Sequence, residues 1–314
     1  MRTSAFLFFA LTAAAADPAL LNFTMPDARF ISGIQVDQSK KSPFGQYVLK
    51  QMQADDDELR KFILETGFDP ARDLTEIVAA TTGTAENPKT VIIGRGSFHP
   101  ELFASAARAH GGSVSLYNGI ELLAHTSPRG EGAIAFLDAS TAVMGDIDAV
   151  RAAIDRKRSP TAVSPDIASR IRNLSAANDA WFLSTGPIAD FLGGKVADEN
   201  LGQAMQGNLL QAILQASGGV RFGADTVQIS AEALTKSEKD ASSLGDVLRF
   251  LTSLVTLQKS KSDQAAKLAS LADSLQITTR GSTLALSMAI PEKVMEQLFI
   301  AKPPAAAPKA RAEQ

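Results

Sequence analysis

Three histidines are the first candidates for chemistry in this sequence, because imidazole serves as a general base and as a metal ligand near neutral pH. They are His99, His110 and His125. A zinc site takes three or four ligands and often draws two from one helix, as in His-Glu-x-x-His, and no pair here has that spacing. We interpret His99 as a helix N-cap before Pro100, His110 as the end of that helix, and His125 as the end of a strand. No metal site is predicted, and a site of two histidines and one carboxylate stays an open alternative.

The sequence contains no recognisable nucleophile. It has no cysteine and no Gly-x-Ser-x-Gly segment, the turn that presents the serine of many hydrolases. Paired carboxylates that cleave glycosidic bonds have no fixed spacing in sequence, so the sequence neither identifies nor dismisses them. No catalytic residue and no cofactor-binding residue is therefore predicted. A secreted hydrolase that uses dispersed Asp and Glu residues is kept as an alternative.

Two short segments resemble ligand-binding motifs and fail on their spacing. Gly94-Arg95-Gly96 follows a predicted strand, but a dinucleotide fingerprint needs a third glycine where the chain has His99, and it belongs to a parallel β-α-β unit. The acidic run 55–58 would need Gly and Glu at the sixth and twelfth positions of a calcium loop, where Arg60 and Thr66 stand. We interpret the first segment as a turn, and the second as a solvated helix face or a break between helices.

The N-terminal segment has the pattern of a secretory signal peptide. Arg2 provides a positive charge, residues 5–11 form an apolar run too short to cross a bilayer, and Ala14-x-Ala16 is a small-residue cleavage site before Asp17. The sequence therefore predicts cleavage after Ala16 and a mature protein in the periplasm or outside the cell. The remaining chain has no second apolar span and no cysteine for lipid attachment, so no transmembrane anchor is expected after cleavage.

The composition is that of a globular protein with a mixed, mildly acidic surface. Hydrophobic residues make up 45% of the 314 positions, and the formal net charge is −3. Nucleic acid is not expected as a partner, because it would require a dense basic patch. The basic run 156–158 is interpreted as the solvated C-terminal turn of a helix, where cations suit the helix dipole. Residues 301–314 hold three prolines and no large apolar side chain, which predicts a disordered tail.

Strands and amphipathic helices alternate along the first part of the mature chain. Strands are predicted at 29–36, 74–82, 89–95, 114–117, 120–125, 133–137 and 141–144. Helices are predicted from Ser42-Pro43 to about residue 65, from Pro100 to His110, and from Asp146 as N-cap to Lys157. Asn118-Gly119 is the strongest local signal, because this pair between two strand patterns favours a two-residue hairpin turn.

A similar order of elements follows a connector at 158–178 that carries one short helix near 165–174. Strands are predicted at 180–185, 220–223, 226–234, 275–280 and 283–289. Helices are predicted from 186 to about 216 with an interruption at 193–194, from a capping box at Ser237 to about 257, at 263–272 and at 291–299. Trp181 lies within an apolar strand and is interpreted as a core residue. The helix 244–257 is expected to pack against a sheet.

These elements predict an α+β fold with antiparallel sheets and helices packed on one face. Both parts run strand, helix, hairpin, helix, antiparallel strands, helix, so we expect two tandem pseudo-repeated subdomains of split β-α-β character. The expected organisation is a signal peptide at 1–16, an N-terminal subdomain at 17–157, the connector at 158–178, a C-terminal subdomain at 179–300, and the tail at 301–314.

Several segments resemble uncharacterised exported bacterial proteins that are grouped as domains of unknown function. The segments are Met25-Pro-Asp-Ala-Arg-Phe-Ile-Ser-Gly-Ile, Ser42-Pro-Phe-Gly, Gly67-Phe-Asp-Pro-Ala-Arg-Asp-Leu and Leu275-Gln-Ile-Thr-Thr-Arg-Gly-Ser-Thr-Leu-Ala-Leu-Ser. They touch both predicted subdomains, and each is short. The resemblance implies export and a bacterial cell envelope, and it assigns no residue a role.

Without a reactive constellation, the sequence predicts a non-enzymatic binding or structural protein of the bacterial cell envelope. The expected partner is another protein or an envelope component, contacted by addition of a strand to an exposed sheet edge. Two alternatives stay open, the hydrolase with dispersed carboxylates and an accessory factor that associates with a membrane surface.

Overall fold

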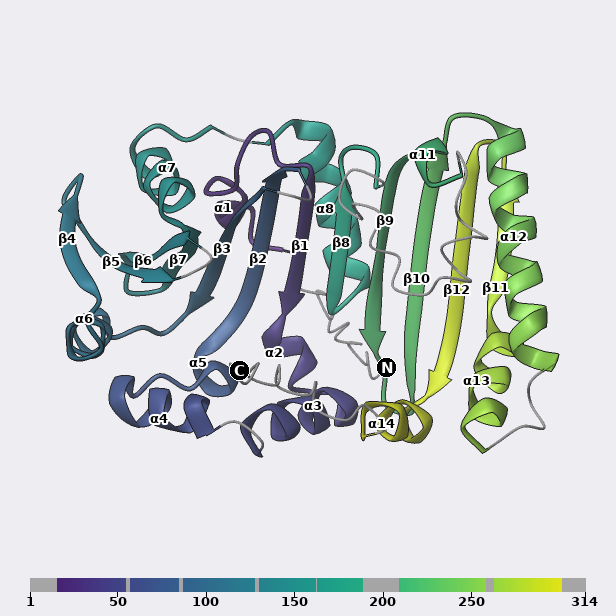
Figure 1. Cartoon of the computed structure of the whole chain (residues 1–314), viewed down its shortest axis with the longest axis horizontal. Helices are drawn as coiled ribbons and strands as arrows, with labels where there is room; N and C mark the ends of the chain where they lie inside the picture. Colours follow the sequence, from purple (N-terminus) through teal and green to yellow (C-terminus); the bar gives the residue numbers. More distant parts are fainter. Residues whose placement is uncertain are drawn as a thin grey trace, which may run out of the picture.

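One antiparallel sheet of twelve strands organises the described part of the molecule (Figure 1). The computed structural model describes residues 16–54, 57–84, 87–127, 130–161, 163–188, 209–257 and 263–300. The strand order is β11-β12-β10-β9-β8-β1-β2-β3-β7-β6-β5-β4, and every neighbouring pair is antiparallel. The α+β class is confirmed, and the sheet continues through both predicted subdomains.

The strands are short to medium in length. They are β1 (Phe30–Gln35), β2 (Leu74–Gly83), β3 (Pro88–Gly96), β4 (Ser113–Tyr117), β5 (Ile120–Ser127), β6 (Gly130–Asp138), β7 (Thr141–Asp146), β8 (Ala180–Ser184), β9 (Ile213–Phe222), β10 (Thr226–Thr235), β11 (Gln276–Arg280) and β12 (Thr283–Pro291). The described helices are α1 (Pro18–Leu21), α2 (Val36–Ser39), α3 (Pro43–Ala54), α4 (Asp57–Thr66), α5 (Pro70–Asp73), α6 (Pro100–Ala109), α7 (Ile147–Arg158), α8 (Pro165–Ala177), α11 (Leu209–Ala212), α12 (Glu238–Leu257), α13 (Asp263–Ser274) and α14 (Glu292–Ile300).

The β1–β8 pair joins the two parts of this sheet. Outward from β1 the order is β1-β2-β3-β7-β6, and outward from β8 it is β8-β9-β10-β12-β11. The two orders match once the β4–β5 hairpin is set aside, and β1 and β8 are antiparallel to each other. The duplication itself stays a prediction, because agreement in strand order does not establish common ancestry.

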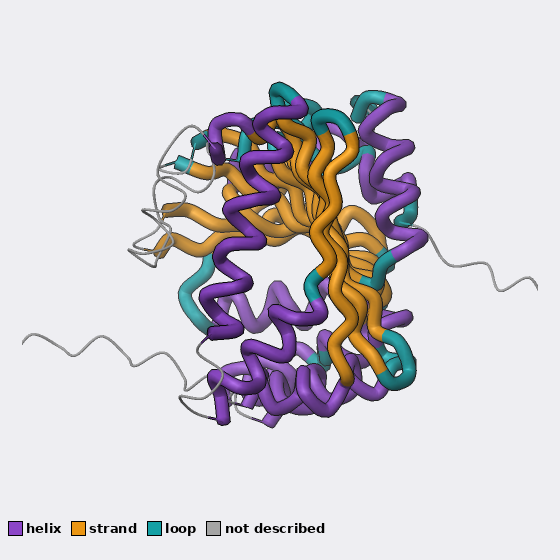
Figure 2. Tube along the Cα trace, turned by 90° about the vertical axis from the view of Figure 1, so that its right-hand side faces the viewer, coloured by secondary structure: helices purple, strands orange, loops and turns teal. Residues whose placement is uncertain are grey.

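Helices lie against both faces of the sheet, so the expectation of one covered face is wrong (Figure 2). Residues 133 and 135 of β6 pack with α7, whereas residues 134 and 136 pack with α4 and α6. Successive side chains of a strand point to opposite faces. Because β6 and β7 carry apolar side chains on both sides, each face needs a helical cover.

The split β-α-β arrangement is also absent from the described strands. In that unit the two strands joined by a helix run parallel with another strand between them. Here β1 and β2 are direct antiparallel neighbours although four described helices lie between them along the chain. In Figure 1, α3 and α4 lie along the lower end of the sheet, so the chain leaves β1 and enters β2 at the same end.

Local sequence signals hold where they depend on neighbouring residues alone. Asn118 and Gly119 have φ values of 50° and 82°, as the predicted hairpin turn requires. The Ser42 hydroxyl accepts the Gly45 N–H at 2.9 Å, and the Ser237 hydroxyl accepts the Asp240 N–H at 3.1 Å. Both serines therefore cap their helices as predicted.

Three local predictions are wrong because distant segments compete for the same residues. Residues 213–216 belong to strand β9, where pairing with β10 replaces the predicted helix. Asp146 precedes α7 without capping it, and its carboxylate accepts the Thr90 N–H at 2.6 Å. Arg156 is only 9% exposed and donates to the Phe23 carbonyl at 3.0 Å, so this residue of the basic run is not solvated, whereas Lys157 and Arg158 are exposed in the last turn of α7 as predicted. Burial lowers the pKa of the Arg156 guanidinium.

Candidate functional site

The described surface has a groove on one face of β5, β6 and β7, walled by α4 and α6. Its volume is about 900 Å³, within the size range of small-molecule sites. We call it the α6 groove. Its lining residues are Phe62, Glu65, Thr66, Thr90, Phe103, Ala106, Ala107, His110, Gly112, Leu123, Ala124, His125, Gly130, Glu131, Gly132, Ala133, Ile134, Met144, Gly145 and Asp146.

One stripe of α6 forms a wall of the groove. Residues 103, 106, 107 and 110 all line it, and this spacing places them on one face of a helix. The opposite wall and floor come from the sheet, where Met144 pairs across from Ile134. Met144 is 46% exposed, so a large apolar side chain of a strand faces the open groove. An exposed apolar floor between helices is the usual surface of a binding pocket.

An aromatic cluster holds α6 and α4 in place beside the groove. Phe103 lies 5.7 Å from Phe62, 5.4 Å from Phe68 and 4.8 Å from Phe136, measured between ring centroids. Phe98 stacks on Phe68 at 5.4 Å. These contacts join α4, α6, β6 and the loops between them into one apolar unit. Phe62 and Phe103 belong both to this cluster and to the groove lining, so groove shape depends on cluster packing.

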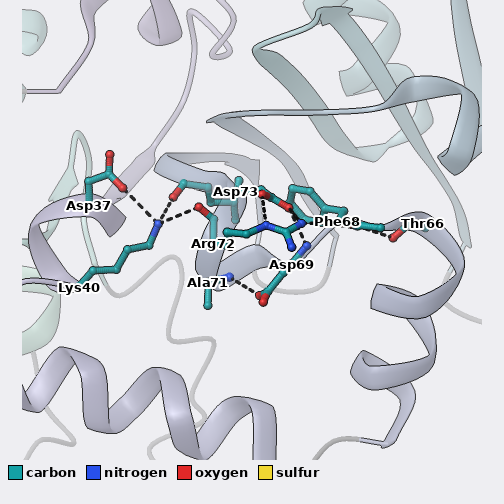
Figure 3. Close-up of polar contacts among 10 residues, drawn as sticks. Asp37, Lys40, Thr66, Phe68, Asp69, Ala71, Arg72 and Asp73 are labelled. Atoms are coloured by element: carbon teal, nitrogen blue, oxygen red, sulfur yellow. Dashed lines mark hydrogen bonds and ion pairs between the residues drawn. The ribbon is translucent and has the colours of Figure 1, made fainter.

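A short polar segment before β2 fixes Phe68 in that cluster (Figure 3). The Asp69 carboxylate accepts the Ala71 N–H at 2.9 Å and so caps α5. The Asp73 carboxylate accepts the Asp69 N–H at 2.8 Å and binds Arg72 through two bonds of 2.7 Å. Lys40 donates to the Leu74 carbonyl at 2.8 Å. This segment lies within one of the stretches that resemble the uncharacterised family, and its role here is structural.

We expect Asp73→Asn to lower the free energy of unfolding by roughly 1 kcal/mol at pH 7, because charge-assisted hydrogen bonds become neutral ones. The hydrogen bond from Arg72 lowers the pKa of Asp73 in the fold. The contribution of the Asp73 carboxylate to the free energy of unfolding is therefore complete above about pH 4, the usual pKa of an Asp side chain in an unfolded chain. It is lost as the pH falls through the lowered pKa of Asp73 in the fold. Urea unfolding from pH 3 to 7 measures this. Asp37→Asn, at an exposed carboxylate that pairs with Lys40, is the matched control and should change little. Equal losses in the two variants would contradict the assignment.

Five ionisable side chains belong to the lining of the α6 groove. His110 Nε2 lies 2.8 Å from Glu65 Oε2, and these side chains are 66% and 43% exposed. His125 stands on β5 opposite Gly132, and Glu131 and Asp146 line the same hollow. The lining thus carries three carboxylates against two histidines, which makes the polar part of a largely apolar groove acidic.

Two of the three histidines therefore share a site that spacing alone did not suggest. His110 is the C-cap residue of α6, as predicted, and it also pairs with Glu65 of α4. His99 occupies the predicted N-cap position but makes no capping bond, and its ring lies 3.7 Å from Glu101 outside the groove. Within the described ranges, no group of three His, Asp or Glu side chains is placed to hold a metal ion.

The Gly94-Arg95-Gly96 segment has a structural role within β3. Its neighbours β2 and β7 are antiparallel, so the parallel unit of a dinucleotide site is missing. A Cβ atom at Gly96 would lie 2.5 Å from the Asp73 carbonyl oxygen, which explains the glycine. Arg95 donates to the Thr141 hydroxyl at 2.6 Å and pairs with Asp17 at 2.5 Å.

The remaining sequence candidates divide between core and surface. Trp181 is 3% exposed, which confirms it as a core residue. Helix α12 packs on β10, β11 and β12, as expected, but Phe250, Leu254 and Leu257 at its far end are exposed. Of the acidic run, residues 55 and 56 lie outside the described residues, and 57 and 58 begin α4. No described helix is both long and apolar enough to span a bilayer.

The fold is similar to that of TP0453. Three crystal forms of TP0453, I, III and IV, match with TM-scores of 0.52, 0.55 and 0.56 and sequence identities of 11%, 10% and 12%. The matches cover 92% of this chain and 98–99% of TP0453. At such identities the likeness to TP0453 shows a shared fold alone. No family model and no curated protein sequence matches the chain, in agreement with a resemblance confined to short segments.

Proposed function

We propose that this protein is an exported binding protein of the bacterial envelope whose α6 groove holds a small amphiphile, a molecule with an apolar body and a neutral or cationic polar head. The observation that carries the proposal is the exposed apolar surface of the groove. Met144 of β7 is exposed in its floor, and Phe62 of α4 and Phe103 of α6 belong to its walls. Burial of a ligand's apolar surface there would be favourable by about 25 cal/mol per Å².

The acidic part of the groove lining supports the choice of head group. Glu65, Glu131 and Asp146 belong to it. An anionic head would meet like charge there, whereas an ammonium, amide or hydroxyl head would find acceptors. Specificity would then come from few polar groups beside a large apolar surface, as in most small-molecule sites.

The hydrolase alternative gains one observation, the His110–Glu65 pair inside a hollow. A nucleophile is still needed beside the histidine. The Thr66 hydroxyl donates to the Phe62 carbonyl at 2.6 Å and accepts the Phe68 N–H, so it is committed to structure. The groove lining as described contains no serine and no lysine. We therefore assign the pair to recognition of the head group.

Strand addition by a protein partner is kept as a separate proposal. The sheet edges are β4 and β11, each five residues long, and Leu116 on β4 is exposed. Short edge strands offer few backbone hydrogen bonds to a partner. The groove offers a larger apolar surface, so ligand binding is the function that the geometry favours.

We expect the wild-type protein to bind the neutral fluorescent probe N-phenyl-1-naphthylamine saturably, and Ala106→Trp to weaken the affinity at least about tenfold. Ala106 faces the groove from the middle of α6, so an indole ring there would occupy the apolar floor. The measurement is a fluorescence titration with far-ultraviolet circular dichroism as a folding check. Ala109→Trp, on the exposed side of the same helix, is the matched control and should bind as wild type does.

Competition between amphiphiles of one chain length tests the head group. Dodecylamine and dodecanol should displace the probe at lower concentration than dodecanoate does. Probe binding that is equal in the Ala106 and Ala109 variants would refute the groove as the site. Preference for dodecanoate would refute the proposed head group while leaving the groove intact.

A further inference from the structure

The buried carboxylate of Glu76 lies directly against the backbone nitrogen of Asp17. Both carboxylate oxygens accept the Asp17 N–H, each at 3.2 Å. Glu76 stands on β2 and is 6% exposed, and the Gln35 amide donates to it at 3.0 Å. Among the described residues, no cationic side chain forms a direct salt bridge with this carboxylate. Burial raises the pKa of Glu76, with the N–H bonds opposing it. A buried carboxylate without a bonded cation is costly in a folded protein.

Asp17 is held in this place by three further contacts. Its carboxylate accepts the Ala19 N–H at 2.9 Å, which caps α1, and pairs with Arg95 at 2.5 Å. Its carbonyl accepts the Leu20 N–H at 3.0 Å. Leu20 and Leu21 are buried in the main core, so α1 is anchored there. The nitrogen of Asp17 is therefore fixed in front of Glu76 whatever precedes it.

We propose that proteolytic removal of residues 1–16 creates a new N-terminus at Asp17 whose ammonium group forms a buried ion pair with Glu76. Hydrolysis breaks the Ala16–Asp17 peptide bond with one water molecule and an export-associated endopeptidase. The water's hydroxyl completes the Ala16 carboxyl group, which releases its proton to solution and leaves with the removed segment as a carboxylate. The water's other hydrogen, with one proton from solution, turns the Asp17 nitrogen into an ammonium group.

The geometry separates two cleavage sites that the sequence allows. Ala13-x-Ala15 also has small residues at the required positions, and cleavage there would leave Ala16 as the first residue. The Ala16 N–H donates to the buried hydroxyl of Ser175 at 2.8 Å. A neutral hydroxyl compensates a buried ammonium poorly, whereas a carboxylate compensates it well. The structure thus favours Asp17 as the first residue, at the loss of one small buried methyl group at Ala16.

The proposal rests on the proposed export and is independent of the α6 groove. The full chain is expressed with its own N-terminal segment, and the exported protein is analysed by mass spectrometry. The mature protein should begin at Asp17. A mature form that begins at Ala16, or a chain that is exported uncleaved, would overturn the proposed processing. Loss of probe binding in the groove would leave this result unaffected.

Ion pairing is tested on two purified forms, one that begins at Asp17 and one that begins at Ala15, each with and without Glu76→Gln. In the Asp17 form, Glu76→Gln should lower Tm at pH 7, because the ammonium loses its partner. In the Ala15 form the same change should leave Tm unchanged or raise it, because it removes a buried unpaired carboxylate and keeps an acceptor. Equal effects in both forms would overturn the ion pair.

A second readout separates pairing from a general effect on packing. The α-amino group of the Asp17 form should titrate at least about one unit above its usual pKa near 8, and Glu76→Gln should restore the usual value. The groups around Glu76 are the Asp17 carboxylate, the Arg95 guanidinium and the Gln35 amide. The Tm advantage of the Asp17 form should shrink at acidic pH, as Glu76 becomes protonated, and above the raised amine pKa. An α-amino group that titrates at its usual pKa in the Asp17 form would contradict the proposal.

Discussion

Trp181→Ala is expected to lower the free energy of unfolding by about 3–5 kcal/mol, as large aromatic truncations in a core do. Trp181 is 3% exposed and stands on β8, paired with Gly33 of β1 on one side and Gly219 of β9 on the other. A Cβ atom at Gly33 would lie 2.4 Å from the indole ring, so the ring covers the bare backbone of β1. The indole therefore packs across the strand pair that joins the two parts of the sheet.

Urea unfolding at pH 7 measures this loss, and an unchanged m-value would show that both proteins unfold from the same compact state. Trp181→Phe should lower the free energy of unfolding much less than Trp181→Ala does. The ring would still cover Gly33, and the Nε1 group, which finds no acceptor among the described residues, would be removed. A Trp181→Ala protein within about 1 kcal/mol of wild type would show that the indole is not a main packing element.

Gly33→Ala completes a double-mutant cycle with Trp181. In the wild-type background the added methyl group meets the indole and should be clearly destabilising. In the Trp181→Ala background the same methyl group has space, so its effect should nearly disappear. Additive losses would contradict direct packing of the indole on Gly33.

Gly145→Ala is expected to lower the free energy of unfolding by at least about 3 kcal/mol, although only one methyl group is added. Gly145 has φ of 144°, which side-chain-bearing residues rarely adopt. An added Cβ atom would also lie 2.1 Å from the Thr90 carbonyl oxygen on the neighbouring strand β3. Neither backbone can move without breaking the β3–β7 ladder. Because Gly145 lines the α6 groove, probe binding should weaken as well.

Gly132→Ala is the matched control for this change. Gly132 lines the same groove from β6, and an added Cβ atom would lie 3.7 Å from the nearest atom, which is ordinary contact. Thermal unfolding and probe titration of the two variants should therefore differ sharply. Similar stability of the two alanine variants would show that the strain at Gly145 is relieved by local adjustment.

The α6 groove could be anticipated only in part from the sequence. The helix at Pro100–His110 and the strands that became β5, β6 and β7 are predicted from the sequence, and these elements are observed. The meeting of His110 with Glu65 could not be anticipated, because the pair spans 45 residues and depends on how α4 packs against α6. Met144 carries no sequence signal as a groove residue, since an exposed and a buried methionine in a strand look alike.

The sequence by itself determined the features that neighbouring residues control. These are the hairpin turn at Asn118-Gly119, the helix starts at Ser42 and Ser237, the burial of Trp181 and the α+β class. Hydrogen bonds across two or three residues, and apolar periodicity within one element, are enough to fix them.

Only the tertiary structure decided how these elements combine. The joining of β1 to β8 in one sheet, helices on both faces, the strand at 213–216 and the buried Arg156 all depend on contacts between distant segments. Local propensities differ by small amounts, so pairing and burial between such segments outweigh them. The same reason places the Asp17 nitrogen before Glu76, 59 residues away, where no local pattern could show it.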